Sequence, residues 1–151
     1  MARSIGYEEL VRLFPMLSAG TILPMRCVCR VQGRGRFIKQ RSEQPPQFGD
    51  VEISASPAAV LSVHLAHAWP SEVSPDETAR LDNSLLLGLV EGIAREEWPP
   101  MGCALTCEAV GYVSGDTTPV AVRIAAAMAV RDMCRRPGWE GDGGAAPPEV
   151  A

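Results

Sequence analysis

The side chains of this sequence that are best placed for chemistry are positive charges clustered near the N-terminus. The segment from Arg26 to Arg41 contains six basic side chains and no acidic one. Residues 1–50 carry a net charge of +4, whereas residues 51–151 carry −8. This asymmetry is typical of a surface that faces a polyanion on an otherwise acidic body. A solvated hairpin face is the alternative interpretation, and charge alone does not separate the two.

Five cysteines form the second group with chemical potential: Cys27, Cys29, Cys103, Cys107 and Cys134. The first two share one face of a predicted strand, as do the next two, so four thiols could bind zinc if these faces met. The C-x-C and C-x₃-C spacings differ from those of common zinc sites, and the surrounding residues are apolar. We therefore expect reduced, buried thiols that pack as small hydrophobic side chains, and no bound metal.

Groups suited to catalysis are sparse. His64 and His67 would point to opposite faces of a strand, so they would not share a ligand. Glu96 and Glu97 occupy adjacent helix positions and do not converge on a substrate. The sequence has no Walker phosphate loop and no G-x-G-x-x-G that opens a helix. A Ser–His–Asp site stays open because its members need not be close in sequence, but we predict no catalytic residues, no cofactor and no bound nucleotide.

The elements that must position the basic cluster are predicted to be strands. Alternating or continuous apolar patterns predict four of them, at residues 22–31, 36–41, 50–56 and 60–68. The glycine-rich segment 32–35 is expected to turn the chain between the first two strands. Pro45 and Pro46 predict a loop over residues 42–47. The basic residues would then flank a hairpin.

The second half of the chain shows helical periodicity. Ser74 followed by Pro75, with Glu77 three residues after the cap, predicts a helix that ends near Trp98. A strand is expected at 103–110 and a helix from Pro119 to the Pro137–Gly138 stop, and a shorter helix is expected at 6–17. In the last helix Val120, Ile124 and Met128 recur at i, i+4, and alanines at 125–129 form a small face suited to close packing. This element order predicts an α+β domain with a mostly antiparallel sheet of four to five strands and helices on one face.

The length of 151 residues suits a single domain. We expect a helical N-terminal extension at 1–20, the domain at 21–138, and a disordered tail rich in Gly, Ala and Pro at 139–151. No apolar stretch approaches the roughly 20 residues of a membrane span. The first residues lack the apolar core of a signal peptide. We therefore expect a cytoplasmic protein that does not contact membranes.

Five short motifs occur in the same order as the predicted elements. They are GRFIKQ at 35–40, QFGDVEI at 47–53, VEGI at 90–93, PMG at 100–102 and DTTPVAVRIAA at 116–126. Together they resemble domain IV of elongation factor G, which has G-K-F-I-R-Q, Q-Y-G-H-V, K-G-I, P-L-x-G and D-S-S-E-x-A-F-K-x-A-A at the matching places. The likeness spans about residues 24–136 and implies a ribosomal protein S5 domain 2-like fold.

In that family the domain reaches the decoding site of the small ribosomal subunit through the loops at its tip. This sequence departs from the family at both loops. Residues 42–46 (SEQPP) replace the family's G-G-R-G, so the glycine amides that could approach RNA closely are lost. Residues 111–115 (GYVSG) lack the family's histidine. The sequence contains no GTPase domain, so energy-driven translocation is not expected of it.

The flank of the hairpin is the part of the family's interface that this sequence keeps. Arg34, Arg36, Lys39 and Arg41 are the candidate contacts to RNA phosphates, and Phe37 could stack on a base or belong to the core. We predict a non-catalytic, translation-associated protein that binds the ribosome or ribosomal RNA, with a protein partner such as a separate translational GTPase. The alternative is a protein–protein interaction module that keeps the fold and has lost the RNA-contacting tip.

Overall fold

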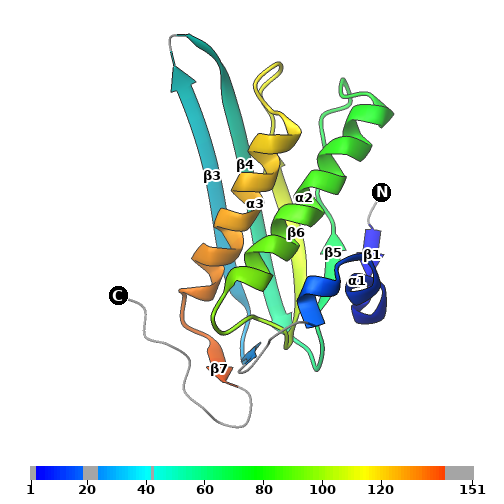
Figure 1. The fold of residues 1–151 in the computed structure, drawn as a ribbon, viewed down its shortest axis with the longest axis vertical. Coiled ribbons are helices and arrows are strands. Elements are labelled where there is room, and N and C mark those ends of the chain that lie inside the picture. Colours follow the sequence, from blue (N-terminus) through cyan, green and yellow to red (C-terminus); the bar gives the residue numbers. More distant parts are fainter. Residues whose placement is uncertain (1–2, 19–23, 42, 142–151) are drawn as a thin grey trace.

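The chain folds into a five-stranded sheet with two long helices side by side against it (Figure 1). The structure is a computed structural model that describes residues 3–18, 24–41 and 43–141. The strand order across the sheet is β1-β5-β6-β4-β3. All neighbours are antiparallel except β5 and β6, which are parallel and are connected through helix α2. The strand bounds are β1 Arg3–Ile5, β3 Val31–Arg41, β4 Gln44–Pro57, β5 Ser62–Leu65 and β6 Cys103–Gly111. The predicted α+β class with a mostly antiparallel sheet is confirmed.

The two long helices begin where their capping residues predict. Helix α2 spans Pro75–Arg95, and the Ser74 hydroxyl accepts a hydrogen bond from the Glu77 amide at 3.1 Å. Helix α3 spans Pro119–Cys134, and the Thr118 hydroxyl accepts from the Ala121 amide at 3.1 Å. Each helix has proline in its first turn, where no intrahelical amide donor is needed.

Helix α3 packs unusually close to its neighbours through its alanine face, as its composition predicts. Glycines face it from three elements: Gly33 and Gly35 on β3, Gly49 on β4, and Gly88 and Gly92 on α2. A Cβ at Gly33 would lie 2.5 Å from the Ala129 carbonyl oxygen. The glycines therefore set the depth at which α3 lies on the sheet.

The hairpin turn lies elsewhere than predicted. Residues 32–35 lie within the first half of strand β3 and do not form a turn, because Gly33 and Gly35 serve close packing against α3. Strand β4 begins at Gln44, so the predicted loop at 42–47 is mostly strand. Pro45 and Pro46 are tolerated there because β6 pairs with β4 only from Asp50 onward, which leaves that side of the strand unpaired. A register shift between Lys39 and Arg41 adds an irregularity at this end of the hairpin.

The N-terminal segment belongs to the same folded unit as the rest of the chain. β1 pairs with β5, and helix α1 (Tyr7–Leu13) and the 3-10 turn η1 (Pro15–Ser18) follow it. Ile5, Leu10 and Leu17 are buried in the common core. The described part of the expected extension at 1–20 is thus joined to the sheet, and its apolar side chains complete the core. Residues 19–23 lie outside the described residues.

Two short strands close the end of the molecule opposite the hairpin turn. β2 (Met25–Cys27) pairs with β7 (Trp139–Gly141), so the tail expected from residue 139 is folded through Gly141. Trp139 is buried, and its indole donates a hydrogen bond to the Met133 carbonyl at 3.0 Å. Residues 142–151 lie outside the described residues. Within the part of the chain that the structure describes, no helix has the length and apolarity of a membrane span.

Candidate nucleic-acid interface

The outer part of the β3–β4 hairpin projects past the rest of the sheet as a two-stranded ribbon, formed by residues 36–41 and 43–49 (Figure 1). The base of the ribbon is Asp50, where the pairing of β4 with β6 begins. The Phe48 amide donates to the Asp116 carbonyl at 2.9 Å, which ties the ribbon to the segment before α3. Such a ribbon is narrow enough to enter a groove of a nucleic acid.

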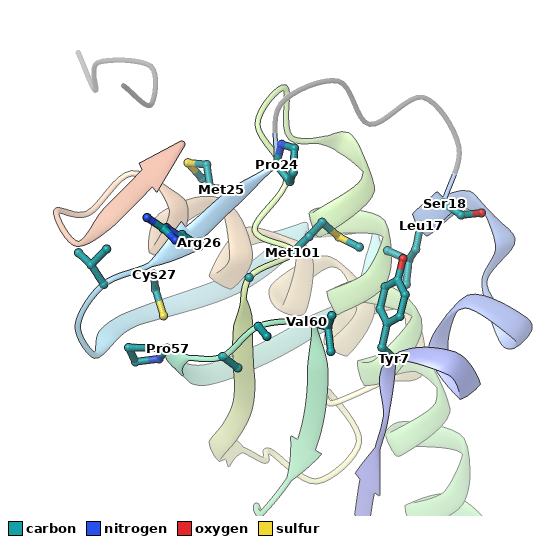
Figure 2. A pocket seen from close by; sticks show the side chains of 14 residues that line it. Tyr7, Leu17, Ser18, Pro24, Met25, Arg26, Cys27, Pro57, Val60 and Met101 are labelled. Carbon is teal, nitrogen blue, oxygen red and sulfur yellow. The ribbon is translucent and has the colours of Figure 1, made fainter. Parts of the chain in front are cut away.

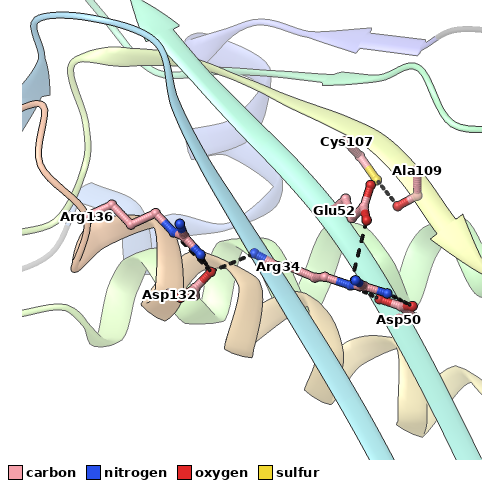
Figure 3. A network of polar contacts seen from close by, with 7 residues as sticks. All are labelled: Arg34, Asp50, Glu52, Cys107, Ala109, Asp132 and Arg136. Atoms are coloured by element: carbon pink, nitrogen blue, oxygen red, sulfur yellow. Dashed lines mark hydrogen bonds and ion pairs between the residues drawn. The ribbon is translucent and has the colours of Figure 1, made fainter.

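Arg34 lies below the ribbon and its charge is balanced within the protein. Its guanidinium makes two hydrogen bonds to Asp50, Nε–Oδ1 at 2.9 Å and Nη2–Oδ2 at 2.6 Å, and it lies 3.7 Å from Glu52 (Figure 3). The bonds to Asp50 raise the pKa of Arg34. The Arg34 amide also donates to Asp132 of α3 at 2.9 Å. Arg34 thus joins β3, β4 and α3, and its charge is balanced by Asp50 and Glu52.

The other predicted residues occupy the ribbon on two faces. Arg36 is exposed on the face that carries Arg34, and its guanidinium carbon lies 5.6 Å from the centre of the Phe48 ring. Lys39 is half-buried on the opposite face, toward α3, in line with Gly35 and Phe37. Arg41 ends β3, and its side chain lies outside the described part of the structure. The structure brings Arg34 and Arg36 to one face and separates them from Lys39.

Phe37 is partly buried and packs against the core, so the core interpretation of this side chain is confirmed. Ile38 is exposed at 52% and points the other way, on the same face of the strand as Arg36. The acidic partners of Arg34 were not predicted, because they depend on the cross-strand register. Arg34 lies opposite Glu52 and Arg36 opposite Asp50 only when the turn follows Arg41.

The two histidines have different partners. The His64 ring is hydrogen-bonded to the Ser4 hydroxyl, whereas His67 Nε2 lies 2.7 Å from Asp82 Oδ1. Trp69 donates its indole N–H to the same Asp82 oxygen at 2.7 Å. In the ranges that the structure describes, neither histidine has both a hydroxyl and a carboxylate partner, so a Ser–His–Asp arrangement is not assembled there.

An apolar pocket of about 960 Å³, shown in Figure 2, lies beside β2 and α1, away from the turn between β3 and β4 (Figure 1). Its walls come from the N-terminal segment, β2, the loop after β4 and the segment before β6, and include Tyr7, Leu17, Met25, Val60 and Met101. Arg26 also lines it but is bound to Glu140 at 2.9 Å. The lining can accommodate an apolar group, but it provides no pair of groups for acid–base or nucleophilic chemistry.

Four of the five thiols are buried, as expected: Cys27, Cys103, Cys107 and Cys134. Cys29 is exposed and lies beyond the end of β2, so the expectation that it shares a strand face with Cys27 is wrong. Among the described residues, no group of three or more His, Cys, Asp or Glu is placed to hold a metal ion.

Thiol reactivity should follow this burial. Burial raises the pKa of Cys103 and of Cys107 to about 12, and a protonated thiol is a poor nucleophile. We expect iodoacetamide at mildly alkaline pH to modify Cys29 quickly in the folded protein and the other four only after denaturation. Mass spectrometry of timed samples would measure this, and early labelling of Cys103 would contradict it.

Comparison with known proteins supports the fold alone. The sequence matches no protein-family model and no curated protein. Among solved structures, the crystal structure of a protein from Thermus thermophilus is similar, with a TM-score of 0.63 and 20% identity. The match covers 81% of this chain but only 18% of that protein. At this identity the likeness shows a shared class of fold, an α+β domain. In the Thermus protein this domain is part of a longer chain.

Proposed function

We propose that this protein is a non-catalytic, translation-associated protein that binds the ribosome or ribosomal RNA through the ribbon. The observation that carries the proposal is the ribbon itself, a projecting pair of strands that presents basic side chains. Arg36 is exposed on it, and within the described part of the chain neither Arg36 nor Lys39 forms an ion pair within 4.0 Å. Cations that are not neutralised internally are the ones that release counterions when they contact phosphate.

The sequence resemblance supports the same surface. Its first two motifs, residues 35–40 and 47–53, pair with each other across β3 and β4 and so build most of the ribbon and its base. The altered tip residues favour contacts along the ribbon's flanks over contacts at its end, because proline lacks an amide donor and Glu43 repels phosphate.

The test is binding of the full chain to purified ribosomes and to ribosomal RNA at several salt concentrations. We expect Arg36→Glu with Lys39→Glu to weaken binding about tenfold and to lower the salt slope by about two. Arg34 is left unchanged, because a glutamate there would face Asp50 and Glu52 and disturb the fold.

The control is Arg12→Glu with Arg80→Glu, which changes the net charge equally at exposed positions outside the ribbon. This control should bind as the unmodified protein does. Absence of association at low salt would overturn the proposal. Protein partners that persist after nuclease treatment, without any RNA affinity, would instead favour the protein-interaction module.

A further inference from the structure

The outward face of helix α3 carries three apolar side chains at i, i+4 spacing. Val120 and Met128 are exposed at 58% and 41%, and Ile124 between them is half-buried. The alanines and Val122, Val130 and Met133 take the inward face instead. A stripe of apolar residues at i, i+4 spacing on the solvent side is typical of a surface that meets another molecule.

This stripe forms one wall of a groove of about 680 Å³ between α2 and α3, which lie side by side (Figure 1). Gly92 of α2 and Ala127 of α3 also line the groove. A Cβ at Gly92 would lie 3.1 Å from the Ala127 Cα, so the two helices approach closely at the groove, which runs between them. Its shape suits a rod-like occupant such as a helix.

The groove is basic although the chain is acidic overall. It is lined by four arginines, Arg95, Arg123, Arg131 and Arg135, and by two glutamates, Glu91 and Glu96. Its net charge of +2 contrasts with −4 for the whole sequence. The bonds from Arg123 to Glu91, one of them Nη2–Oε2 at 2.6 Å, join the two helices and balance both of these charges.

Two arginines at one end of the groove remain available. Among the residues that the structure describes, Arg131 and Arg135 form no ion pair within 4.0 Å. Their influence reaches Glu96, where burial raises the carboxyl pKa and both arginines partly offset that effect. The end of the groove near Arg131 and Arg135 therefore presents positive charge next to the apolar stripe.

We infer that the α2–α3 groove docks an acidic amphipathic helix of a partner protein. The apolar face of such a helix would cover Val120, Ile124 and Met128, and its carboxylates would reach Arg131 and Arg135. RNA fits less well, because no aromatic side chain lines the groove for base stacking. A second copy would present the same net-positive lining to this face, so self-association through it is disfavoured.

The test uses the full chain with methyl-labelled Val, Ile and Met, observed by NMR. The probe is a synthetic amphipathic peptide of four helical turns with leucine on one face and glutamate elsewhere. A peptide with lysine in place of each glutamate is its matched control. We expect the glutamate peptide to shift the methyl signals of Ile124 and Met128, and binding to weaken about tenfold in Arg131→Glu with Arg135→Glu.

The charge-matched variant Arg12→Glu with Arg80→Glu should bind the glutamate peptide normally. The inference is overturned if neither peptide binds at low salt, if both bind equally, or if the shifted methyl groups lie outside the groove. It is also overturned if a single-stranded RNA shifts the groove methyls more strongly. Concentration-dependent self-association that Met128→Glu abolishes would assign the groove to a second copy instead. None of these outcomes depends on RNA binding by the ribbon.

Discussion

Replacing Gly35 by alanine should lower the free energy of unfolding by about 3 kcal/mol or more. A Cβ at this position would meet the backbone carbonyl of Ala125 and the amide nitrogen of Ala129, which lies 2.5 Å away. These are backbone atoms of α3, so no rotamer change can make room. The helix must move outward, which would open its alanine face along β3 and β4 and loosen its contacts with α2.

Denaturant unfolding followed by circular dichroism would measure this effect. The matched control is Gly6→Ala, because a Cβ at Gly6 meets nothing within 4 Å. Gly6 is the N-cap of α1, where the change should cost less than about 1 kcal/mol. Equal unfolding midpoints for the two variants would show that α3 can shift at little cost.

The same glycines explain which part of the fold could be predicted. The Ser74 cap, the start of the last helix at Pro119 and the alanine face of α3 are local signals, and the structure bears them out. The turn predicted at Gly33 and Gly35 was wrong because a pair of glycines has two physical uses. It can turn the chain, or it can let the backbone of another element pack closely against it. Only the partner helix, much later in the sequence, decides between them.

Prediction of the candidate site was limited in the same way, because the sequence does not show which residues lie opposite one another in the fold. The clustering of positive charge is visible in the sequence. The pairing of Arg34 with Asp50 depends on the register between β3 and β4, which could not be predicted once the turn was placed at residues 32–35. The periodicity of Val120, Ile124 and Met128 indicated a stripe without indicating which side of α3 it occupies. The glycines of β3, β4 and α2 settle this, because the side of α3 that carries its alanines packs against them and leaves Val120 and Met128 exposed.

Asp82→Ala should destabilise the protein by about 2 kcal/mol, since it leaves two donors without their acceptor. His67 and Trp69 both point at Asp82 Oδ1 at 2.7 Å, and the His67 side chain is 2% exposed. Asp82 itself is 29% exposed, so water can replace part of the lost contact and the full cost of two buried groups is not expected. The change would also weaken the edge contacts between Trp69 and Tyr112.

Asp82→Asn separates the charge of this residue from its role as acceptor. Burial alone would raise the pKa of the Asp82 carboxyl, but the hydrogen bonds from His67 and Trp69 outweigh burial and hold the pKa below its ordinary value of 3.8. Because the folded-state pKa is the lower one, the carboxylate contributes stability above the unfolded-state pKa and loses it as pH falls through the folded-state pKa. The unmodified protein should therefore lose stability on acidification below about pH 4, and Asp82→Asn should lose less over the same range. Thermal unfolding midpoints of both proteins across this range would test the assignment, and parallel curves would exclude Asp82 as the group responsible.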